Sequence, residues 1–103
     1  MNNVQLIGRL TTDPNSKPAA GRTVCEMRIA IDRPKGKGAD FIDVHAWGKL
    51  AETCAQHLAK GRLIACDGRL RHEEWTTEAG RRSRVLVVAD SVRFLDKPKA
   101  AAE

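Results

Sequence analysis

The stretch DFIDVHAWGKLAETCAQHLAKG, residues 40–61, changes its hydrophobic period half way along. Over residues 40–47 the period is two, which predicts a β-strand with one inward and one outward face. The inward face would carry Ile42, Val44 and Ala46, and the outward face Phe41, Asp43, His45 and Trp47. The second half has apolar residues at helical spacing and ends at Gly61, a residue suited to a helix C-terminus. The stretch therefore predicts a strand followed directly by a short helix.

The same reasoning predicts four more strands, over residues 3–10, 24–31, 63–70 and 83–95. Proline and glycine interrupt residues 11–22 and 32–40, which predicts loops there. Residues 71–82 are expected to form the arms and tip of a long hairpin, and Gly68 marks a bend or bulge before it. This order predicts an all-β OB-fold, a five-stranded Greek-key barrel with one α-helix between strands three and four. A split sheet covered by one helix stays open as the alternative.

The chain has 103 residues, which suits one domain. We expect that domain over residues 1–96 and a short disordered tail over 97–103. No stretch approaches the roughly 18 apolar residues of a membrane helix, and no signal-peptide pattern opens the sequence. These features predict a cytoplasmic protein without membrane contact, or one given without its targeting segment.

The three cysteines, Cys25, Cys54 and Cys66, are widely spaced and form no CxxC pair. A disulfide framework or a zinc site therefore has little support, and we expect Cys54 and Cys66 to be small hydrophobic core residues. No Ser-His-Asp arrangement, phosphate-binding glycine loop or metal-ligand spacing is present. The sequence predicts no catalytic residues, no metal and no cofactor, and hence no enzyme.

The functional prediction is based on the aromatic rings and the positive charge of the chain. The net charge is +5, from 18 Lys and Arg against 13 Asp and Glu, which favours a phosphate-rich partner. Phe41, Trp47 and Trp75 are expected on the outside of the barrel, among basic residues. Unpaired bases expose faces on which such rings stack, and basic side chains follow the backbone. The predicted residues for binding a single-stranded nucleic acid are Phe41, Trp47, Trp75, Arg28, Arg33, Lys35, Lys37, Lys49, Arg69, Arg71, Arg82 and Arg84.

Each of these residues has a plainer interpretation. Exposed tryptophans also occur at subunit contacts, and a phenylalanine at a strand start often fills a core. The cations of residues 33–37 fit a solvated turn equally well. We expect the histidines His45, His57 and His72 to be surface or capping residues, and Glu26 and Asp43 to pair with Arg28.

Four motifs resemble the bacterial single-stranded DNA-binding proteins. They are NNVQLIGRLTTDP at 2–14, WGKLAE at 47–52, LAKG at 58–61 and DGRLRHEEWTTEAGRR at 67–82. The resemblance implies sequence-independent coating of single-stranded DNA in replication, recombination and repair, with Phe41, Trp47 and Trp75 as the stacking residues. A further family aromatic near the end of strand two has no match, because Asp32 and Arg33 stand there. That stacking position is either missing or replaced by a guanidinium, which can also stack on a base.

The resemblance also implies an assembly and a location. The family's usual form is a homotetramer associated with the nucleoid in the cytoplasm. Ile42 stands where some members carry a histidine that supports the tetramer, so a homodimer is the alternative. The family's long tail with an acidic tip is not seen after residue 96, so either the tail was removed or this is a short form of the family. Recruitment of repair enzymes through a tail is therefore not expected. A primosome-type OB-fold adaptor, which binds single strands weakly and a replication protein well, remains the second functional hypothesis. A further functional hypothesis is a structural module whose exposed rings form subunit contacts.

Overall fold

The structure is a computed structural model that describes residues 1–97, with six strands, one α-helix and one 3-10 turn in that range. The elements are β1 (Val4–Leu10), β2 (Asn15–Ala19), β3 (Arg22–Asp32), η1 (Pro34–Gly36), β4 (Ala39–Trp47), α1 (Lys49–His57), β5 (Leu63–Thr77) and β6 (Gly80–Phe94). The disordered tail predicted over 97–103 lies outside the described residues from position 98 onward.

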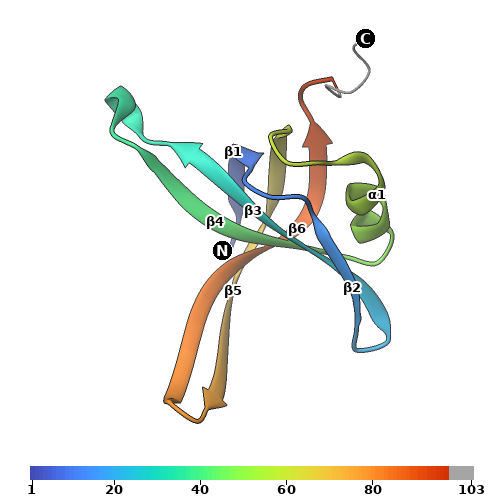
Figure 1. The fold of residues 1–103 in the computed structure, drawn as a ribbon, viewed down its shortest axis with the longest axis vertical. Coiled ribbons are helices and arrows are strands. Elements are labelled where there is room, and N and C mark those ends of the chain that lie inside the picture. Colours follow the sequence, from blue (N-terminus) through green and yellow to red (C-terminus); the bar gives the residue numbers. More distant parts are fainter. Residues whose placement is uncertain (98–103) are drawn as a thin grey trace.

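The strands form one sheet in the order β1-β5-β6-β4-β3-β2. β1 pairs with β5 from Val4 to Arg9, and its last residues pair with β3 at Arg9↔Ala30 and Leu10↔Ile29. Because β1 joins both sides, the sheet closes into a small barrel. The pairs are antiparallel except β4 with β6. The all-β OB-fold prediction is confirmed, including the helix between the predicted third and fourth strands (Figure 1).

The predicted number of strands was wrong, because β2 lies in the segment predicted as a loop. β2 pairs residue by residue with β3, from Asn15↔Glu26 to Ala19↔Arg22. Four of its five residues are exposed, so the strand carries no alternation of apolar and polar residues. Pro18 is tolerated because β2 is an edge strand, where a missing N–H leaves no neighbour unpaired. Pairing in space therefore makes this strand, and hydrophobic pattern gives no sign of it.

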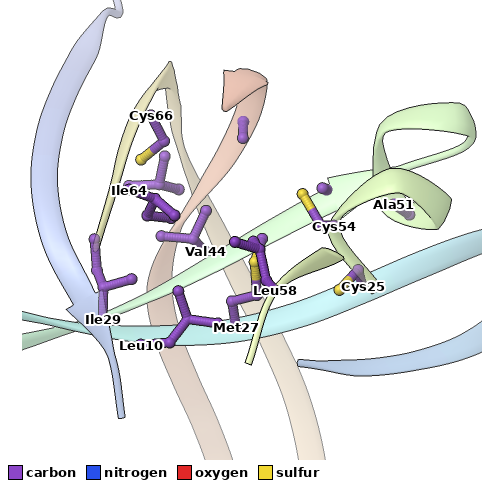
Figure 2. Packing of buried hydrophobic residues seen from close by; sticks show 13 residues of the cluster. Leu10, Cys25, Met27, Ile29, Val44, Ala51, Cys54, Leu58, Ile64 and Cys66 are labelled. Atoms are coloured by element: carbon purple, nitrogen blue, oxygen red, sulfur yellow. The ribbon is translucent and has the colours of Figure 1, made fainter. Parts of the chain in front are cut away.

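The core lies between the barrel strands and α1, which packs on β3 and β4. Figure 2 shows Cys54 of the helix pointing toward the buried barrel residues, and Ala51 belongs to the same buried cluster. The three cysteines are buried thiols, as predicted for Cys54 and Cys66. The helix ends at His57, earlier than Gly61, because Leu58 turns into extended backbone and buries its side chain in the core.

The hairpin of β5 and β6 is longer than predicted, since each strand runs continuously for 15 residues. The register shifts between Asp67 and Gly68, which confirms the irregularity expected at this glycine. A Cβ on Gly68 would lie 2.0 Å from the carbonyl oxygen of Val88, so a side chain does not fit there. The far half of this hairpin projects away from the barrel (Figure 1). It carries Trp75 out beyond the core.

Among residues 1–97, no helix is both long enough and apolar enough to cross a bilayer.

Candidate nucleic-acid interface

The three predicted stacking rings lie on the outside of the barrel and its long hairpin. Phe41, near the start of β4, is 54% exposed, and Trp75, on the far part of β5, is 43% exposed. Trp47 is half-buried at the end of β4. The outward face predicted for Phe41 and Trp47 is therefore present. The inward positions of Val44 and Ala46 are fully buried.

His45 departs from the prediction that it lies on the surface, since it is only 6% exposed. It points to the same side of β4 as Phe41 and Trp47, but its neighbours on adjacent strands cover it. Its Nε2 lies 3.9 Å from a carboxylate oxygen of Glu26 on β3. Burial lowers the pKa of His45, and the neighbouring Glu26 carboxylate opposes this in part. Strand period gives the direction of a side chain, but not what covers it.

Each of the three rings has an arginine guanidinium on it. The Cζ atoms of Arg22, Arg28 and Arg84 lie 5.5, 5.5 and 5.8 Å from the ring centroids of Trp47, Phe41 and Trp75, respectively. These distances are within the range of cation–π attraction. The surface therefore presents flat rings with a positive group already beside each.

Three open cavities connect these ring and arginine pairs. The cavity beside Trp47 is lined by Arg22, Arg69 and Arg71, and the cavity beside Trp75 is lined by Arg71 and Arg84. The third cavity contains Arg84 and Arg28, together with Asp43, Glu26 and His45. Arg71 and Arg84 are each shared by two cavities. The three cavities therefore adjoin one another, and Phe41 lies beside them through its contact with Arg28. We call this surface the ring face, defined by Trp47, Arg71, Trp75, Arg84, Arg28 and Phe41.

Carboxylates hold several of the cations on the ring face. Asp43 lies 3.4 Å from Nη1 of Arg28, as predicted for this pair, and 4.0 Å from Nη1 of Arg84. Glu73 lies 3.0 Å from Nη2 of Arg84. Glu26 pairs with Lys17 at 3.3 Å and not with Arg28. A polyanion that binds here must compete with these carboxylates for the same guanidinium groups.

Except for Arg69, the remaining predicted cations lie away from the three cavities. Arg33 is held in the hairpin between β3 and β4, where Nε and Nη2 both lie 2.8 Å from Oδ1 of Asp40. Lys35 and Lys37 are exposed at the tip of that hairpin, and Lys49 is exposed at the start of α1. Arg82 is exposed and pairs across the hairpin with Trp75. Arg69 lines the Trp47 cavity while bound to Asp90 at 3.0 Å.

Two cations that the sequence analysis did not select lie at this face. Lys17 of β2 lines the cavity beside Trp75, and Arg22 at the start of β3 lies on Trp47. Both belong to the segment predicted as a loop. The signal that could have found them is the spacing of basic residues around the turn at Gly21, which puts both on one hairpin.

The buried thiols offer no reactive group to this surface. Burial raises the pKa of Cys54 to about 12, so the thiol stays protonated near neutral pH. Within the range 1–97, no three His, Cys, Asp or Glu side chains are grouped as metal ligands would be. The chemistry available at the ring face is therefore stacking, charge pairing and hydrogen bonding.

Comparison with known proteins matches a profile of the Single-strand binding protein family to residues 1–95. The chain belongs to this family. The match spans every strand of the barrel and all three rings of the ring face.

Individual relatives agree with the family match. The single-stranded DNA-binding protein of Clostridium tetani is 45% identical over 103 residues, which cover 93% of this chain and 71% of the relative. The protein of the same name from Aquifex aeolicus is 38% identical over 109 residues, covering 98% of this chain and 74% of the relative. Single-stranded DNA-binding protein 2 of Clostridium acetobutylicum is 42% identical over 103 residues, which cover 93% of this chain and 77% of the relative.

Proposed function

We propose that this chain binds single-stranded DNA and coats it without sequence preference, in replication, recombination and repair. Membership of the Single-strand binding protein family supports this function, and the relatives named above carry it in their names. The chain acts as a binding protein and not as an enzyme. The observation on which the proposal rests is the ring face, where Trp47 and Trp75 line cavities that share arginines and the exposed Phe41 lies beside Arg28 of the third cavity.

The ring face explains why a single strand fits better than a duplex. Bases stack on Phe41, Trp47 and Trp75, which requires base faces that a duplex keeps covered. Each stacked base contributes about 1–3 kcal/mol, and it does so for every base, because every base has a π-face. The arginines along the path neutralise phosphates, and this contribution falls as salt rises. The binding is therefore tolerant of sequence and sensitive to ionic strength.

The predicted binding residues have two roles in this proposal. Phe41, Trp47 and Trp75 stack bases, while Arg28, Arg69, Arg71 and Arg84 contact phosphates within the cavities. The other predicted cations extend the positive surface beyond the cavities, where they attract the strand before it docks. These outer cations are Arg33, Lys35, Lys37, Lys49 and Arg82. The binding unit is the domain 1–96.

Tryptophan fluorescence tests the proposal, because both tryptophans of the chain lie on the ring face. Titration with poly-dT at low salt should quench the emission strongly, and added salt should reverse the quenching. A duplex of the same length serves as the control and should quench far less. No quenching at low salt would show that the rings do not meet bases, and the proposal would be wrong.

We further propose a homo-oligomer, with the tetramer before the dimer, acting in the cytoplasm at the nucleoid. Family membership supports this assembly. Analytical ultracentrifugation gives the subunit number directly. A dimer that binds poly-dT weakly and a replication protein tightly would favour the adaptor hypothesis instead.

A further inference from the structure

We propose that Arg22 is a DNA-binding residue that works as one unit with Trp47. A base would stack on the Trp47 ring, and the Arg22 guanidinium would hold that ring and reach the adjoining phosphate. This inference rests on the proposed function, and it adds a residue that lies outside the positions expected to bind DNA from the sequence.

Backbone pairing brings Arg22 to Trp47. Val24 of β3 pairs with Trp47 of β4, and the backbone N–H of Gly48 donates to the carbonyl oxygen of Thr23 at 2.8 Å. These contacts fix the start of β3 beside the end of β4. The Arg22 side chain can then cross to the ring, where its Cζ lies 5.5 Å from the centroid.

Gly48 leaves the space through which the Arg22 guanidinium passes. A Cβ at position 48 would lie 3.1 Å from Nη2 of Arg22, closer than most real Cβ contacts. The backbone of Gly48 also has φ +66°, a conformation that favours glycine. A side chain at this position would therefore crowd the guanidinium as well as strain the backbone.

Arg22 differs from the other two ring-bound arginines in its charge partners. Arg28 is paired with Asp43, and Arg84 is paired with Glu73. In the described part of the chain, no carboxylate lies within ion-pair distance of Arg22. Its guanidinium can therefore bind a phosphate without first leaving a carboxylate, and the planar group can stay on the ring while it does so.

The cavity around this pair has the composition of a nucleotide site. It is lined by Trp47, Arg22, Arg69, Arg71, Ala20 and Val88. The ring and the two small apolar side chains suit a base, while three arginines suit the phosphates on either side of it. Arg71 also lines the cavity at Trp75, so a strand bound here continues toward the second tryptophan.

A double-mutant cycle tests whether Arg22 acts with Trp47. Affinity for oligo-dT is measured by fluorescence anisotropy for Arg22→Ala, Trp47→Ala and the double variant. A second cycle replaces Trp47→Ala by Trp75→Ala. Arg22→Ala should weaken binding about tenfold in the wild-type chain and in the Trp75→Ala background, but about threefold or less in the Trp47→Ala background. Arg22 is exposed, so the substitution leaves the core intact.

A matched control separates this local effect from general loss of charge. Arg93→Ala removes the same charge at an exposed position that lines a different cavity, with Ile7 and Ser91. Arg22→Lys keeps the charge but not the planar group, so it should restore the salt dependence and leave affinity about threefold below wild type. Trp75→Phe leaves Trp47 as the only tryptophan, and in this background Arg22→Ala should reduce the quenching by oligo-dT.

Three results would overturn the inference: an effect of Arg22→Ala equal to that of Arg93→Ala, full additivity with Trp47→Ala, or complete rescue by lysine. If the wild-type chain itself neither binds oligo-dT nor shows quenching, the proposed function fails instead. The two failures are therefore distinguishable in one set of titrations.

Discussion

Replacing Asp43 by asparagine should tighten the binding of single-stranded DNA. Asp43 lies 3.4 Å from Arg28 and 4.0 Å from Arg84, two arginines of the ring face. Its carboxylate neutralises part of their charge and repels any phosphate that approaches them. Asparagine has nearly the same shape and no charge, so Arg28 loses its carboxylate partner and Arg84 keeps only Glu73, while the packing stays the same.

The magnitude follows from the geometry of a shared guanidinium. A phosphate oxygen bound to the free edge of Arg28 would lie about 6 Å from the Asp43 carboxylate, given hydrogen bonds of about 2.8 Å. Coulomb repulsion at that distance is about 0.7 kcal/mol with the dielectric constant of water, and about 1.4 kcal/mol with half that constant. Removing the repulsion should therefore raise affinity about threefold to tenfold. It should also steepen the log–log salt slope by up to about 0.7, the value for one more neutralised phosphate on a single strand.

The assay is anisotropy of labelled oligo-dT at several salt concentrations, with Asp67→Asn as the matched control. The Asp67→Asn substitution removes the same charge from a residue that lines the cavity of Ile7 and Arg93, away from the ring face. Thermal denaturation checks that both variants fold. Affinity and salt slope equal to those of Asp67→Asn would refute the reasoning, because the strand could not then pass over Arg28 and Arg84.

Three further predictions concern the core and its edges. Burial raises the pKa of the Cys54 thiol to about 12, and the other two cysteines are buried as well. None of the three thiols should react with Ellman's reagent until urea unfolds the chain, and fast reaction of the native protein would contradict this. Burial lowers the pKa of His45, so below about pH 6.5 the unfolded state binds more protons and stability falls; His45→Gln should reduce this loss in urea melts at pH 7.5 and 5.5. Arg62→Ala should lower the thermal midpoint by several degrees, since the buried guanidinium joins Asp96 to the carbonyl of His57, and an unchanged midpoint would show that this link is unimportant. Arg62 lowers the pKa of Asp96, so the contribution is present above about pH 3.8 and is lost as pH falls below it.

Much of the barrel could be predicted because most of its strands bury one face. The alternation over residues 40–47 placed Val44 and Ala46 inside and Phe41 and Trp47 outside, as the structure has them. Gly68 marked the register shift, because a glycine inside a strand signals close approach of another backbone. These are local signals, so a single sequence carries them.

The rest depends on contacts between distant segments. β2 is exposed on nearly all its residues and exists because β3 offers it hydrogen bonds, which no hydrophobic pattern records. His45 is buried by neighbouring strands, although its strand position is outward. The place of Arg22 on Trp47 follows from the register of β3 and β4, which the sequence does not reveal. The unpredicted part of the interface is therefore the part built by pairing.

The way the barrel closes has a consequence for how the chain folds. The hairpin of β5 and β6 joins neighbouring segments through a two-residue turn, so little loop entropy opposes its formation. β1 must instead pair with β5, which lies some 60 residues later in the chain, as in the pair Val4↔Gly68. It pairs with β3 through Arg9 and Leu10 only. Contacts of such separation form slowly, so we expect the hairpins to form first and the N-terminal strand to dock last. The rate of barrel closure would then respond to changes in β1 more than to changes in the long hairpin that carries Trp75.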